Sequence, residues 1–571
     1  MPPPSPPRSP SRRSSSHFLA KQPKLRAIPL GGLGEIGRNM MALEYDENIV
    51  VIDAGLMFPE EEMLGVDLVL PDVTYLQERK DKVLAFLLTH GHEDHVGSLP
   101  YILPKVSAPI YGSRLTLGFI KNKLREHKLV EQVDLREIKA GDVVELGPFK
   151  VEFIHVAHSI PDTTALAIQT PVGMVIHTAD FKMDQTPVDG KPTDMARLSH
   201  FGNHGVMLLM SDSTNAERDG FTPSERTIGE AFQELFGQCP GRIIISTFAS
   251  NIYRIQQALN TAARYKRKVA VIGRSMVNNL TIAQELGYIQ MPGDILIKVQ
   301  DINKEPDERL VILSSGSQGE PLSALTRIAA QEHPQVKLKS GDTVILSATP
   351  IPGNEELVSR TINNCYKHGA RVFYSARNRV HASGHASREE LKLMLNLVRP
   401  KFFMPVHGEF RHLALHAEIA QEVGISKDHV IVTDDGNTVE LSDSLPHFGN
   451  KVPAGYVFVD GLGVGDVGSV VLRDRRVLSQ DGIFIVIVTV DKDTGQVVSG
   501  PDLISRGFVH QQTSDALLES ARLQVLATIN KPGRGNPEWQ VIKNSIRDSL
   551  SKFLYEQMRR RPMIIPIVVE V

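Results

Sequence analysis

The chain is 571 residues long, which predicts about three domains, because one domain usually holds roughly 100–200 residues. Hydrophobic residues make up 41% and charged residues 23%, as in ordinary globular proteins, and the net charge of −3 excludes nucleic-acid binding through overall positive charge. Two cysteines exclude a disulfide framework and a cysteine-rich zinc site, and they fit a cytoplasmic protein. No apolar run reaches the ~18 residues of a membrane span.

The first 23 residues have the composition of a tail. The segment MPPPSPPRSPSRRSSS combines proline, serine and arginine, and it has no apolar stretch of the kind that a secretory signal contains. Such a segment cannot bury enough apolar surface to offset its loss of chain entropy, so we predict a disordered basic tail over residues 1–23. Weak contact of this tail with RNA is the alternative to a purely solvated tail.

Residues 24–222 alternate short apolar runs with turns rich in glycine, proline and aspartate. Several runs are apolar or β-branched throughout, as expected for strands that are buried on both faces. The predicted strands are Leu25–Leu30, Asn48–Ile52, Val83–Leu88, Val151–Ala157, Thr164–Gln169, Met174–His177 and Val206–Met210. Polar residues follow several of these strands, which is the usual place for a functional site in a layered α/β fold.

A glycine-rich stretch after the first strand matches a dinucleotide-binding motif but fits another structure better. Residues 32–37, GLGEIG, have the spacing G-x-G-x-x-G, and Asp53 follows at the expected distance. However, the chain continues through Met41, Leu43 and Tyr45 into a further strand, which leaves no room for the helix that the motif requires. We therefore predict a β-hairpin.

From residue 223 the pattern changes to alternating helices and strands, which predicts a doubly wound α/β domain over residues 223–385. Its predicted helices are Glu225–Phe236 and Ile252–Tyr265, and its predicted strands are Arg242–Ser246, Lys268–Ile272, Arg309–Leu313 and Thr343–Leu346. A helix at Arg388–Leu397 and a strand at Phe402–Val406 follow. We predict that residues 386–447 return to the first domain and form its second part.

The glycine-rich stretch Gly455–Gly468 indicates a boundary, so we predict a linker over residues 448–467. The last residues, 468–571, are predicted to form a small α/β domain. Its elements are a strand at Ile483–Val490, helices near Ser514–Ile529 and Trp539–Met558, and a final strand at Met563–Val571.

The strongest chemical signal is THGHEDH, residues 89–95, directly after a predicted strand. A strand that ends in a tight loop can direct His90, His92, Asp94 and His95 into one cavity. Imidazole and carboxylate ligands at this density are typical of zinc or a similar divalent ion, and four ligands in six residues fit two ions better than one. The alternatives are a solvated polar loop and a structural zinc site, although structural sites favour cysteines.

Further ligands must come from later strand ends, because one loop cannot saturate two ions. His158 and Asp180 each follow a predicted strand, and a carboxylate such as Asp180 can bridge two cations ~3.5–4 Å apart. His155 and His177 lie within strands, where we expect core or sheet-face roles. Asp53 ends another strand and either orients a ligating histidine or forms a turn.

These motifs, in this order, resemble those of the metallo-β-lactamase superfamily: Asp53, His90-x-His92-x-Asp94-His95, His158 and Asp180. The resemblance implies an αββα sandwich with a metal site at one edge. It also implies that one ion is held by His90, His92 and His158, that the other is held by Asp94 and His95, and that Asp180 bridges both.

Three later motifs resemble the β-CASP subgroup of that superfamily, whose members act on nucleic acids. They are Asp212 in LLMSDSTN, His385 in HASGHAS and His407 in MPVHGEF. The resemblance implies a β-CASP domain inserted within the lactamase domain, with His407 completing the second metal site. It also implies that Asp212 supports His385, which contacts the scissile phosphate or the leaving group.

Longer stretches are similar to the ribonuclease J group: IPLGGLGEIGRNM, DAGLMFPEEEMLGVD, STFASNIYRIQ, SSGSQGEP and HASGHAS. The likeness covers about residues 24–571, and one departure is Ala179, where glycine is expected. The resemblance implies a cytoplasmic ribonuclease with 5′-to-3′ exonuclease and endonuclease activities in RNA maturation and decay, including rRNA processing and mRNA decay. It further implies RNA substrates with 5′-monophosphate ends, a homodimer or homotetramer formed through the C-terminal region, and partners in an RNA-decay complex.

The expected reaction uses a water activated by two divalent ions per chain, which are zinc or, as the alternative in one or both sites, manganese. Asp94, Asp212 and His385 are the candidate catalytic residues, and His385 either protonates the leaving oxygen or only orients the phosphate. The substrate phosphate is assigned to one donor-rich turn, formed by His381, Ala382, Ser383, Gly384 and His385. Ser250–Arg254 and Ser314–Pro321 are candidates for a terminal 5′-phosphate, with plain strand-to-helix turns as the alternative.

Three other functions stay open at this point. They are a small-ester or thioester hydrolase, a β-CASP DNA nuclease and a catalytically silent RNA-binding module. The long stretch between Asp212 and His385 argues against a small substrate, which needs no covering domain. The presence of every expected ligand argues against a silent module.

Overall fold

The structure, a computed structural model, describes residues 24–320, 322–442, 444–492, 494, 496–509, 515–530 and 539–571. The predicted tail, residues 1–23, lies outside the described residues. The chain divides into two compact units. The first comprises the residues up to Gly55 and Pro71–Gly455, and the second comprises Leu56–Leu70 and Tyr456–Val571.

Two sheets form the centre of the first unit. The larger contains, in order, β23 (His447–Phe448), β22 (Val439–Leu441), β1 (Leu25–Gly31), β3 (Met40–Tyr45), β4 (Asn48–Ile52), β6 (Val83–Leu87), β7 (Ile110–Ser113) and β8 (Leu135–Ile138). The smaller contains, in order, β20 (Pro400–Val406), β13 (Val206–Asp212), β12 (Met174–His177), β11 (Thr164–Gln169), β10 (Phe149–His155) and β9 (Val143–Leu146). Both sheets therefore combine strands that precede residue 213 with strands that follow residue 399.

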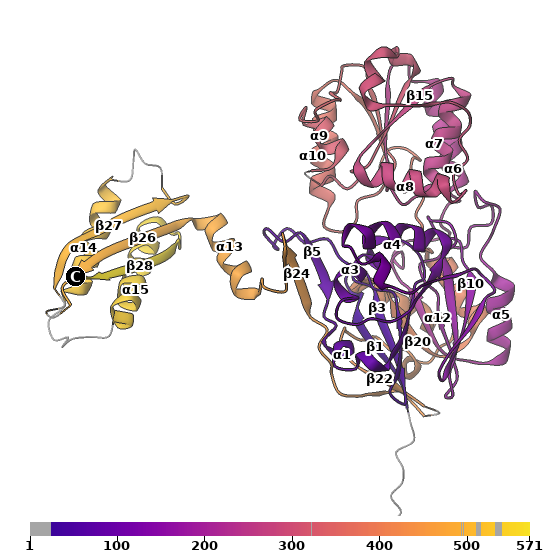
Figure 1. The fold of residues 1–571 in the computed structure, drawn as a ribbon, viewed down its shortest axis with the longest axis horizontal. Coiled ribbons are helices and arrows are strands. Elements are labelled where there is room, and N and C mark those ends of the chain that lie inside the picture. Colours follow the sequence, from indigo (N-terminus) through magenta and orange to yellow (C-terminus); the bar gives the residue numbers. More distant parts are fainter. Residues whose placement is uncertain are drawn as a thin grey trace, which may run out of the picture. The chain divides into compact units, whose positions relative to one another are not determined.

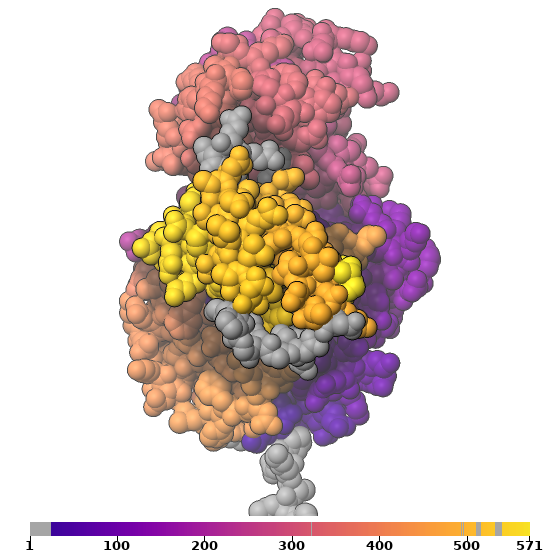
Figure 2. Space-filling model, turned by 90° about the vertical axis from the view of Figure 1, so that its left-hand side faces the viewer, coloured from indigo at the N-terminus to yellow at the C-terminus, as the bar shows by residue number. Residues whose placement is uncertain are grey.

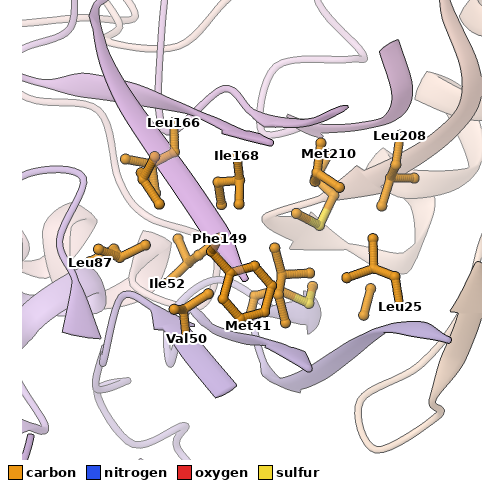
Figure 3. Close-up of a cluster of buried hydrophobic side chains, with 14 of the residues drawn as sticks. Leu25, Met41, Val50, Ile52, Leu87, Phe149, Leu166, Ile168, Leu208 and Met210 are labelled. Carbon is orange, nitrogen blue, oxygen red and sulfur yellow. The ribbon is translucent and has the colours of Figure 1, made fainter. Parts of the chain in front are cut away.

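Apolar side chains fill the space between the two sheets. Figure 3 shows Leu25, Val50 and Leu87 of the larger sheet pointing toward Phe149 and Leu208 of the smaller one. All five side chains are at most 1% exposed. Full burial of one such side chain contributes roughly 1.5–3 kcal/mol, so this core holds the strand ends in fixed positions.

Helices cover the outer faces of the sheets. α4 (Arg114–Glu126) packs on β7 and β8, and α12 (Phe410–Glu422) packs on β20. α11 (Arg388–Val398) packs on both α5 (Met195–His204) and α12. The shorter helices are α1 (Thr74–Gln77), α2 (Glu93–Val96) and α3 (Leu99–Ile102), with 3-10 turns at Lys80–Lys82, Val130–Gln132 and Lys427–His429. These layers form the predicted αββα arrangement, called the sandwich below.

The glycine-rich stretch near the N-terminus forms the loop of a hairpin. β1 and β3 are antiparallel neighbours, which confirms the predicted hairpin in place of a dinucleotide site. Within the loop, β2 (Leu33–Gly34) pairs with β21 (Gly408–Glu409). This pairing brings the loop beside His407.

Between β13 and β20 the chain forms an inserted domain around a parallel sheet. Its strands are, in order, β16 (Leu296–Ile297), β15 (Lys268–Ile272), β17 (Leu310–Ser314), β14 (Ile243–Ser246), β18 (Thr343–Leu346) and β19 (Arg371–Tyr374). Its helices are α6 (Arg226–Gly237), α7 (Ile252–Arg264), α8 (Arg274–Glu285), α9 (Ala324–Ala329) and α10 (Glu355–Lys367), and 3-10 turns lie at Val299–Lys304 and Asp307–Arg309. Figure 1 shows these helices on both faces of the sheet, which confirms the predicted doubly wound fold.

The inserted domain leaves the sandwich and returns to it at adjacent strands. β13 and β20 are parallel neighbours, with Asp212 opposite Val406. In Figure 2 the inserted domain, in pink, lies at the top, whereas the sandwich below it combines indigo and purple residues with orange ones. The carboxyl ends of β13 and β20 therefore lie together, on the side where the chain leaves the sandwich for the inserted domain.

The second unit contains a sheet in the order β27 (Val497–Arg506), β26 (Ile483–Val490) and β28 (Met563–Glu570). α14 (Asp515–Ile529) packs on β27 and α15 (Trp539–Met558) packs on β28, while α13 (Ser469–Asp481) precedes β26. β5 (Leu68–Pro71), β24 (Tyr456–Asp460) and β25 (Gly463–Val464) form a separate small sheet. The fold confirms the predicted small α/β C-terminal domain. No sequence pattern indicated that residues 56–70 associate with it.

Candidate metal centre

All seven predicted metal ligands converge at one edge of the sandwich, where β6, β10, β12 and β20 end. Their ligand atoms form two groups, each within 4.8 Å: His90, His92, His158 and Asp180, and Asp94, His95, Asp180 and His407. Asp180 belongs to both groups. A third group with the same limit adds Asp212 and His385 to Asp180 and His407.

The centre of this cluster is buried. His90, His95 and Asp180 are at most 2% exposed, whereas the side chain of Asp94 is 30% exposed. Oδ2 of Asp180 lies 3.6 Å from Nε2 of His90 and 3.2 Å from Nε2 of His95. One carboxylate oxygen therefore faces imidazoles from both groups, and Asp94 marks the side that solvent reaches.

The protonation states fit a site for cations. Burial and neighbouring imidazoles lower the pKa of His90 and His158 well below the usual value, and burial lowers the pKa of His92 to about 4. Burial alone would raise the pKa of Asp180, but His407 and His95 hold it well below its usual range. At His95, burial alone would lower the pKa, but the carboxylates around it, Asp180 above all, raise it well above its usual value. Neutral imidazoles at the other three histidines, an ionised Asp180 and the negative charge around His95 all favour divalent cations.

Asp53 orients the imidazole of His95 by a hydrogen bond to Nδ1, the ring nitrogen on the side away from the ligand cluster. Its Oδ2 accepts a hydrogen bond from Nδ1 of His95 at 2.8 Å, and its two oxygens accept the backbone N–H and the hydroxyl of Thr89, each at 2.8 Å. Nδ1 of His95 therefore carries the proton, and Nε2 is left for a cation. Asp53 has a φ of +60°, a strained conformation that is common at functional sites. This geometry favours a supporting role over a simple turn.

Asn39 supports His407 in the same way, and sequence reasoning did not find it. Oδ1 of Asn39 accepts a hydrogen bond from Nδ1 of His407 at 2.8 Å, and Nδ2 donates to the backbone oxygen of Asp94 at 3.0 Å. This leaves Nε2 of His407 for a cation, 3.5 Å from Oδ2 of Asp180. The only signal in the sequence was the position of Asn39 in IPLGGLGEIGRNM.

The predicted phosphate-binding turn, His381–His385, contacts the ligand His158 directly. Nδ1 of His158 donates a hydrogen bond to the backbone oxygen of Gly384 at 2.8 Å. A Cβ atom at Gly384 would lie 2.5 Å from Cε1 of His158, so the close approach requires glycine. The turn therefore fixes the tautomer of His158, one of the predicted metal ligands.

Asp212 and His385 form a hydrogen-bonded pair beside the ligands. Oδ2 of Asp212 lies 2.8 Å from Nδ1 of His385, and its Oδ1 accepts the backbone N–H and the hydroxyl of Thr214 at 2.9 and 2.7 Å. Burial alone would lower the pKa of His385, but the charge and hydrogen bond of Asp212 raise it to about 9. The side chain of His385 is 20% exposed, so solvent reaches it although its partner Asp212 is buried.

The rest of the turn is held by side chains from the sandwich. Nδ2 of Asn215 donates hydrogen bonds to Oγ of Ser383 and to the backbone oxygen of His385, both at 2.9 Å. The hydroxyl of Thr222 donates to the same backbone oxygen at 2.7 Å. Ala382 is buried and His381 is half-buried. All predicted phosphate-binding residues therefore lie in one ordered turn beside the ligands.

His155 and His177, for which we expected core or sheet-face roles, lie in different surroundings. Nε2 of His155 is hydrogen-bonded to the backbone oxygen of Lys191 at 3.0 Å, outside the ligand cluster. His177 lines a cavity behind the ligands, where its Nδ1 accepts the backbone N–H of Ala179 at 3.1 Å. Ala179 has a φ of +56°, a conformation that favours glycine and explains why glycine is expected there.

Four family models match the chain. The metallo-β-lactamase superfamily matches residues 33–212, and the Zn-dependent metallo-hydrolase RNA specificity domain matches residues 374–432. The ribonuclease J β-CASP domain matches residues 240–365, and the ribonuclease J C-terminal domain matches residues 470–571. The matched segments together cover both units.

Individual relatives cover nearly the whole chain. It is 46% identical to ribonuclease J2 of Bacillus subtilis (96% of this chain and 99% of that protein) and 43% identical to ribonuclease J of Thermus thermophilus (96% of each). A crystal structure of a protein of unknown function from Enterococcus faecalis covers 73% of this chain and 100% of that one, with a TM-score of 0.52. At 16% identity this last likeness shows the fold alone.

Fold and site together define a metal-dependent hydrolase of the metallo-β-lactamase superfamily with a β-CASP insertion. Within that class, the identities over nearly the full length show that the chain belongs to the ribonuclease J family. It is a metal-dependent ribonuclease, and its His/Asp cluster offers the ligand atoms that divalent ions require. None of the helices in the described part of the chain has the length and apolar composition of a membrane span.

Proposed function

We propose that the chain hydrolyses RNA phosphodiester bonds with two divalent ions, one in each ligand group, bridged by Asp180. The observation that carries this proposal is that Asp180 belongs to both groups. One carboxylate can neutralise part of the charge of two cations and hold them ~3.5–4 Å apart. Bound there, the ions would lower the pKa of a water from ~15.7 toward ~7 and offset charge on the phosphate.

We assign zinc to these sites, because buried, neutral imidazoles dominate the donor set. Manganese is the alternative in either site, above all in the second group, where two carboxylates, Asp94 and Asp180, contribute oxygen ligands. Metal analysis of the purified protein decides between them. Activity after removal of the metal and re-addition of each ion separates the metal that supports turnover from the metal that only occupies the site.

His385 protonates the leaving oxygen in this proposal. Its Nδ1 is hydrogen-bonded to Asp212, which orients the ring, leaves Nε2–H as the donor and stabilises the imidazolium form. Asp212 is itself held by Thr214, so the pair has one orientation. The alternative, that His385 only orients the phosphate, requires the same position but no proton transfer.

The turn His381–His385 binds the substrate phosphate. It lies between the ligand His158 and the inserted domain, and Ser383 and Gly384 give it a small, polar backbone that a phosphate can approach. Nδ1 of His381 accepts a hydrogen bond from Arg254 at 3.0 Å, so Nε2 carries the ring hydrogen and can donate it.

We further propose both 5′-to-3′ exonuclease and endonuclease cutting in RNA maturation and decay, with a preference for 5′-monophosphate ends. A matched set of RNA and DNA oligonucleotides with 5′-monophosphate, 5′-hydroxyl and 5′-triphosphate ends tests this. Rapid release of single nucleotides from 5′-monophosphate RNA is the expected result. Equal turnover of the DNA set would favour the DNA-nuclease alternative, and internal cleavage alone would remove the exonuclease assignment.

A homodimer or homotetramer is proposed for the second unit. Ile485, Ile487, Ile565 and Ile567 lie on the face of its sheet that does not hold the buried residue Val486. Such an aliphatic face is stabilised when a second copy covers it. We also propose a cytoplasmic location and partners in an RNA-decay complex, supported by the RNA-processing function.

A further inference from the structure

Arg254 is the side chain that connects the inserted domain with the phosphate-binding turn. It lies on α7, its residue is 0% exposed, and its guanidinium group has five N–H donors. Nε and Nη2 donate to the two carboxylate oxygens of Glu225 at 2.8 and 2.7 Å. The candidate role of Ser250–Arg254 in binding a 5′-phosphate is therefore not available to this arginine, because its charge is already paired.

The remaining donors of Arg254 reach three backbone or ring acceptors. Nη1 donates to the backbone oxygen of Ser347 at 2.7 Å and to Nδ1 of His381 at 3.0 Å, and Nη2 donates to the backbone oxygen of Ala382 at 3.0 Å. All five donors are thus directed at acceptors. Two of these acceptors are the first two residues of the turn, so the guanidinium plane fixes the position where the turn begins.

The ion pair is also attached to the sandwich beside the ligand Asp180. The backbone N–H of Glu225 donates to Oδ2 of Asp184 at 3.0 Å, and Asp184 pairs with the buried Lys182 at 3.4 Å. Nζ of Lys182 donates to the backbone oxygen of Pro223 at 3.2 Å. The segment Pro223–Glu225, which leads into the inserted domain, is therefore bonded to Lys182 and Asp184, which follow Asp180 by two and four residues in the chain.

The far end of the turn is anchored by the metal centre. Gly384 accepts the hydrogen bond of His158, and His385 pairs with Asp212. One end of a five-residue turn is thus set by Arg254 and the other by two residues of the centre. A shift at His381 or Ala382 would move the phosphate-binding backbone relative to the ions.

We propose that the buried Arg254–Glu225 ion pair is a positioning device for the reaction, which places the turn His381–His385 against the metal centre. Arg254 does not touch the substrate. It acts through His381 and Ala382 on the phosphate position, and through Gly384 on the orientation of His158. This inference rests on the phosphate role proposed above for the turn.

The inserted domain offers a matched control in Arg242. This side chain is 2% exposed and forms a bidentate pair with Asp342 at 2.9 and 2.6 Å, together with a bond to the backbone oxygen of Lys337 at 2.6 Å. It has the same charge, burial and partner type as Arg254 but no hydrogen bond to the turn. Replacement of either arginine by lysine deprives a buried carboxylate of its bidentate partner, so the cost to stability is expected to be similar.

The experiment compares Arg254→Lys with Arg242→Lys in the full-length chain. Thermal unfolding midpoints, affinity of the metal-free protein for zinc, and kcat and KM on a 5′-monophosphate RNA are measured for both. We expect similar unfolding midpoints, but a kcat about 10–100-fold lower in Arg254→Lys alone, since a misplacement of about 1 Å can cost about 100-fold. Zinc affinity is expected to fall about 3–10-fold in Arg254→Lys, less than the 10–100-fold typical of losing a direct partner of a ligand.

Equal kcat and equal zinc affinity in the two lysine variants would overturn the inference and leave Arg254 a structural residue. If Arg254→Lys does not fold, the pair Arg254→Met with Glu225→Met is compared with Arg242→Met and Asp342→Met, because apolar replacement of a whole buried pair is often neutral. Equal kcat and equal zinc affinity in the two double variants would again overturn the inference, and a selective loss in the Arg254–Glu225 variant would support it.

His385→Ala separates this inference from the function proposed above. If it turns over RNA at the wild-type rate, the phosphate and proton roles of the turn fail, and the positioning inference fails with them. If His385→Ala loses activity while the Arg254 variants match their controls, only the positioning inference fails.

Discussion

The metal centre of the first unit and the sheet of the second unit depart from the usual burial pattern in opposite directions. In the metal centre, His90, His95 and Asp180 are at most 2% exposed. In the second unit Thr528 is the only buried polar residue among those described, whereas Ile567 is 41% exposed. Buried ionisable groups and exposed apolar patches are the two informative exceptions to the rule that apolar residues lie inside.

Both the buried charges and the exposed apolar face are stabilised when a binding partner covers them. Burial of Asp180 among imidazoles costs solvation energy, which the proposed pair of cations would offset. Exposure of Ile565 and Ile567 leaves apolar surface in water, and a second apolar surface removes it at roughly 25 cal/mol per Å². The buried charges of the first unit therefore favour polar ligands, and the exposed aliphatic face of the second unit supports the proposed contact with a second copy.

The largest expected effect comes from removing the charge of the bridging carboxylate. Asp180→Asn should lower kcat at least about 10⁴-fold, because both ligand groups lose their shared anion. Metal content measured on the purified variant should fall in parallel. Asp134→Asn, at a carboxylate that is 54% exposed, is the control. Turnover within tenfold of wild type would show that the buried charge is not what the reaction needs.

His385→Ala tests the accessible part of the polar site. We expect kcat to fall about 10²–10³-fold on RNA, because a positioned proton donor contributes about that much. On a phosphodiester with an activated leaving group the loss should be much smaller, since that group leaves without a proton. Equal losses on both substrates would assign His385 to orientation of the phosphate alone.

Asn39→Leu should weaken metal binding without disturbing the core. Loss of the hydrogen bond to Nδ1 of His407 is expected to lower zinc affinity about 10–100-fold, the usual cost of losing a partner of a ligand. Competition with a chromophoric chelator measures it. Asn122→Leu, on the outer helix α4, should bind zinc as wild type does, and an equal affinity in the two variants would contradict the supporting role of Asn39.

Charges on the exposed face of the second unit's sheet should change the oligomeric state but not the turnover per chain. Ile565→Glu combined with Ile567→Glu places charges on the exposed face and should shift the particle mass, measured by light scattering, toward a single chain. Turnover per chain on a short RNA should stay within about twofold to threefold. Glu519→Lys, at an exposed position on α14, is the control, and an unchanged mass in the double variant would refute the proposed role of this face.

The smallest effect is expected at Ala179. Ala179→Gly removes the strain of a left-handed backbone, but it also frees the unfolded chain and removes a buried methyl group. These contributions oppose each other, so the free energy of unfolding, measured by urea denaturation, should change by less than about 1 kcal/mol. Turnover should stay within about threefold, and a larger change would show that Ala179 influences ligation by Asp180.

The sequence by itself determined the fold class and predicted all seven candidate metal ligands that the structure brings together. Apolar runs of strand length predict buried strands, and the residues after each run, such as His90, His158 and Asp180, must lie at strand ends. The motif order from Asp53 to His407 supplied the family. These features are local in the chain or fixed in order, so they can be read without coordinates.

Only the tertiary structure decided which partners hold the ligands in place. Asn39 supports His407 because β2 pairs with β21, and Arg254 is engaged by Glu225, His381 and Ala382 instead of facing a phosphate. The physical reason is that a hydrogen bond depends on distance and direction between atoms, and these are set by packing of elements that lie far apart in the chain. Residue type shows what a side chain can donate, and the fold decides where it donates.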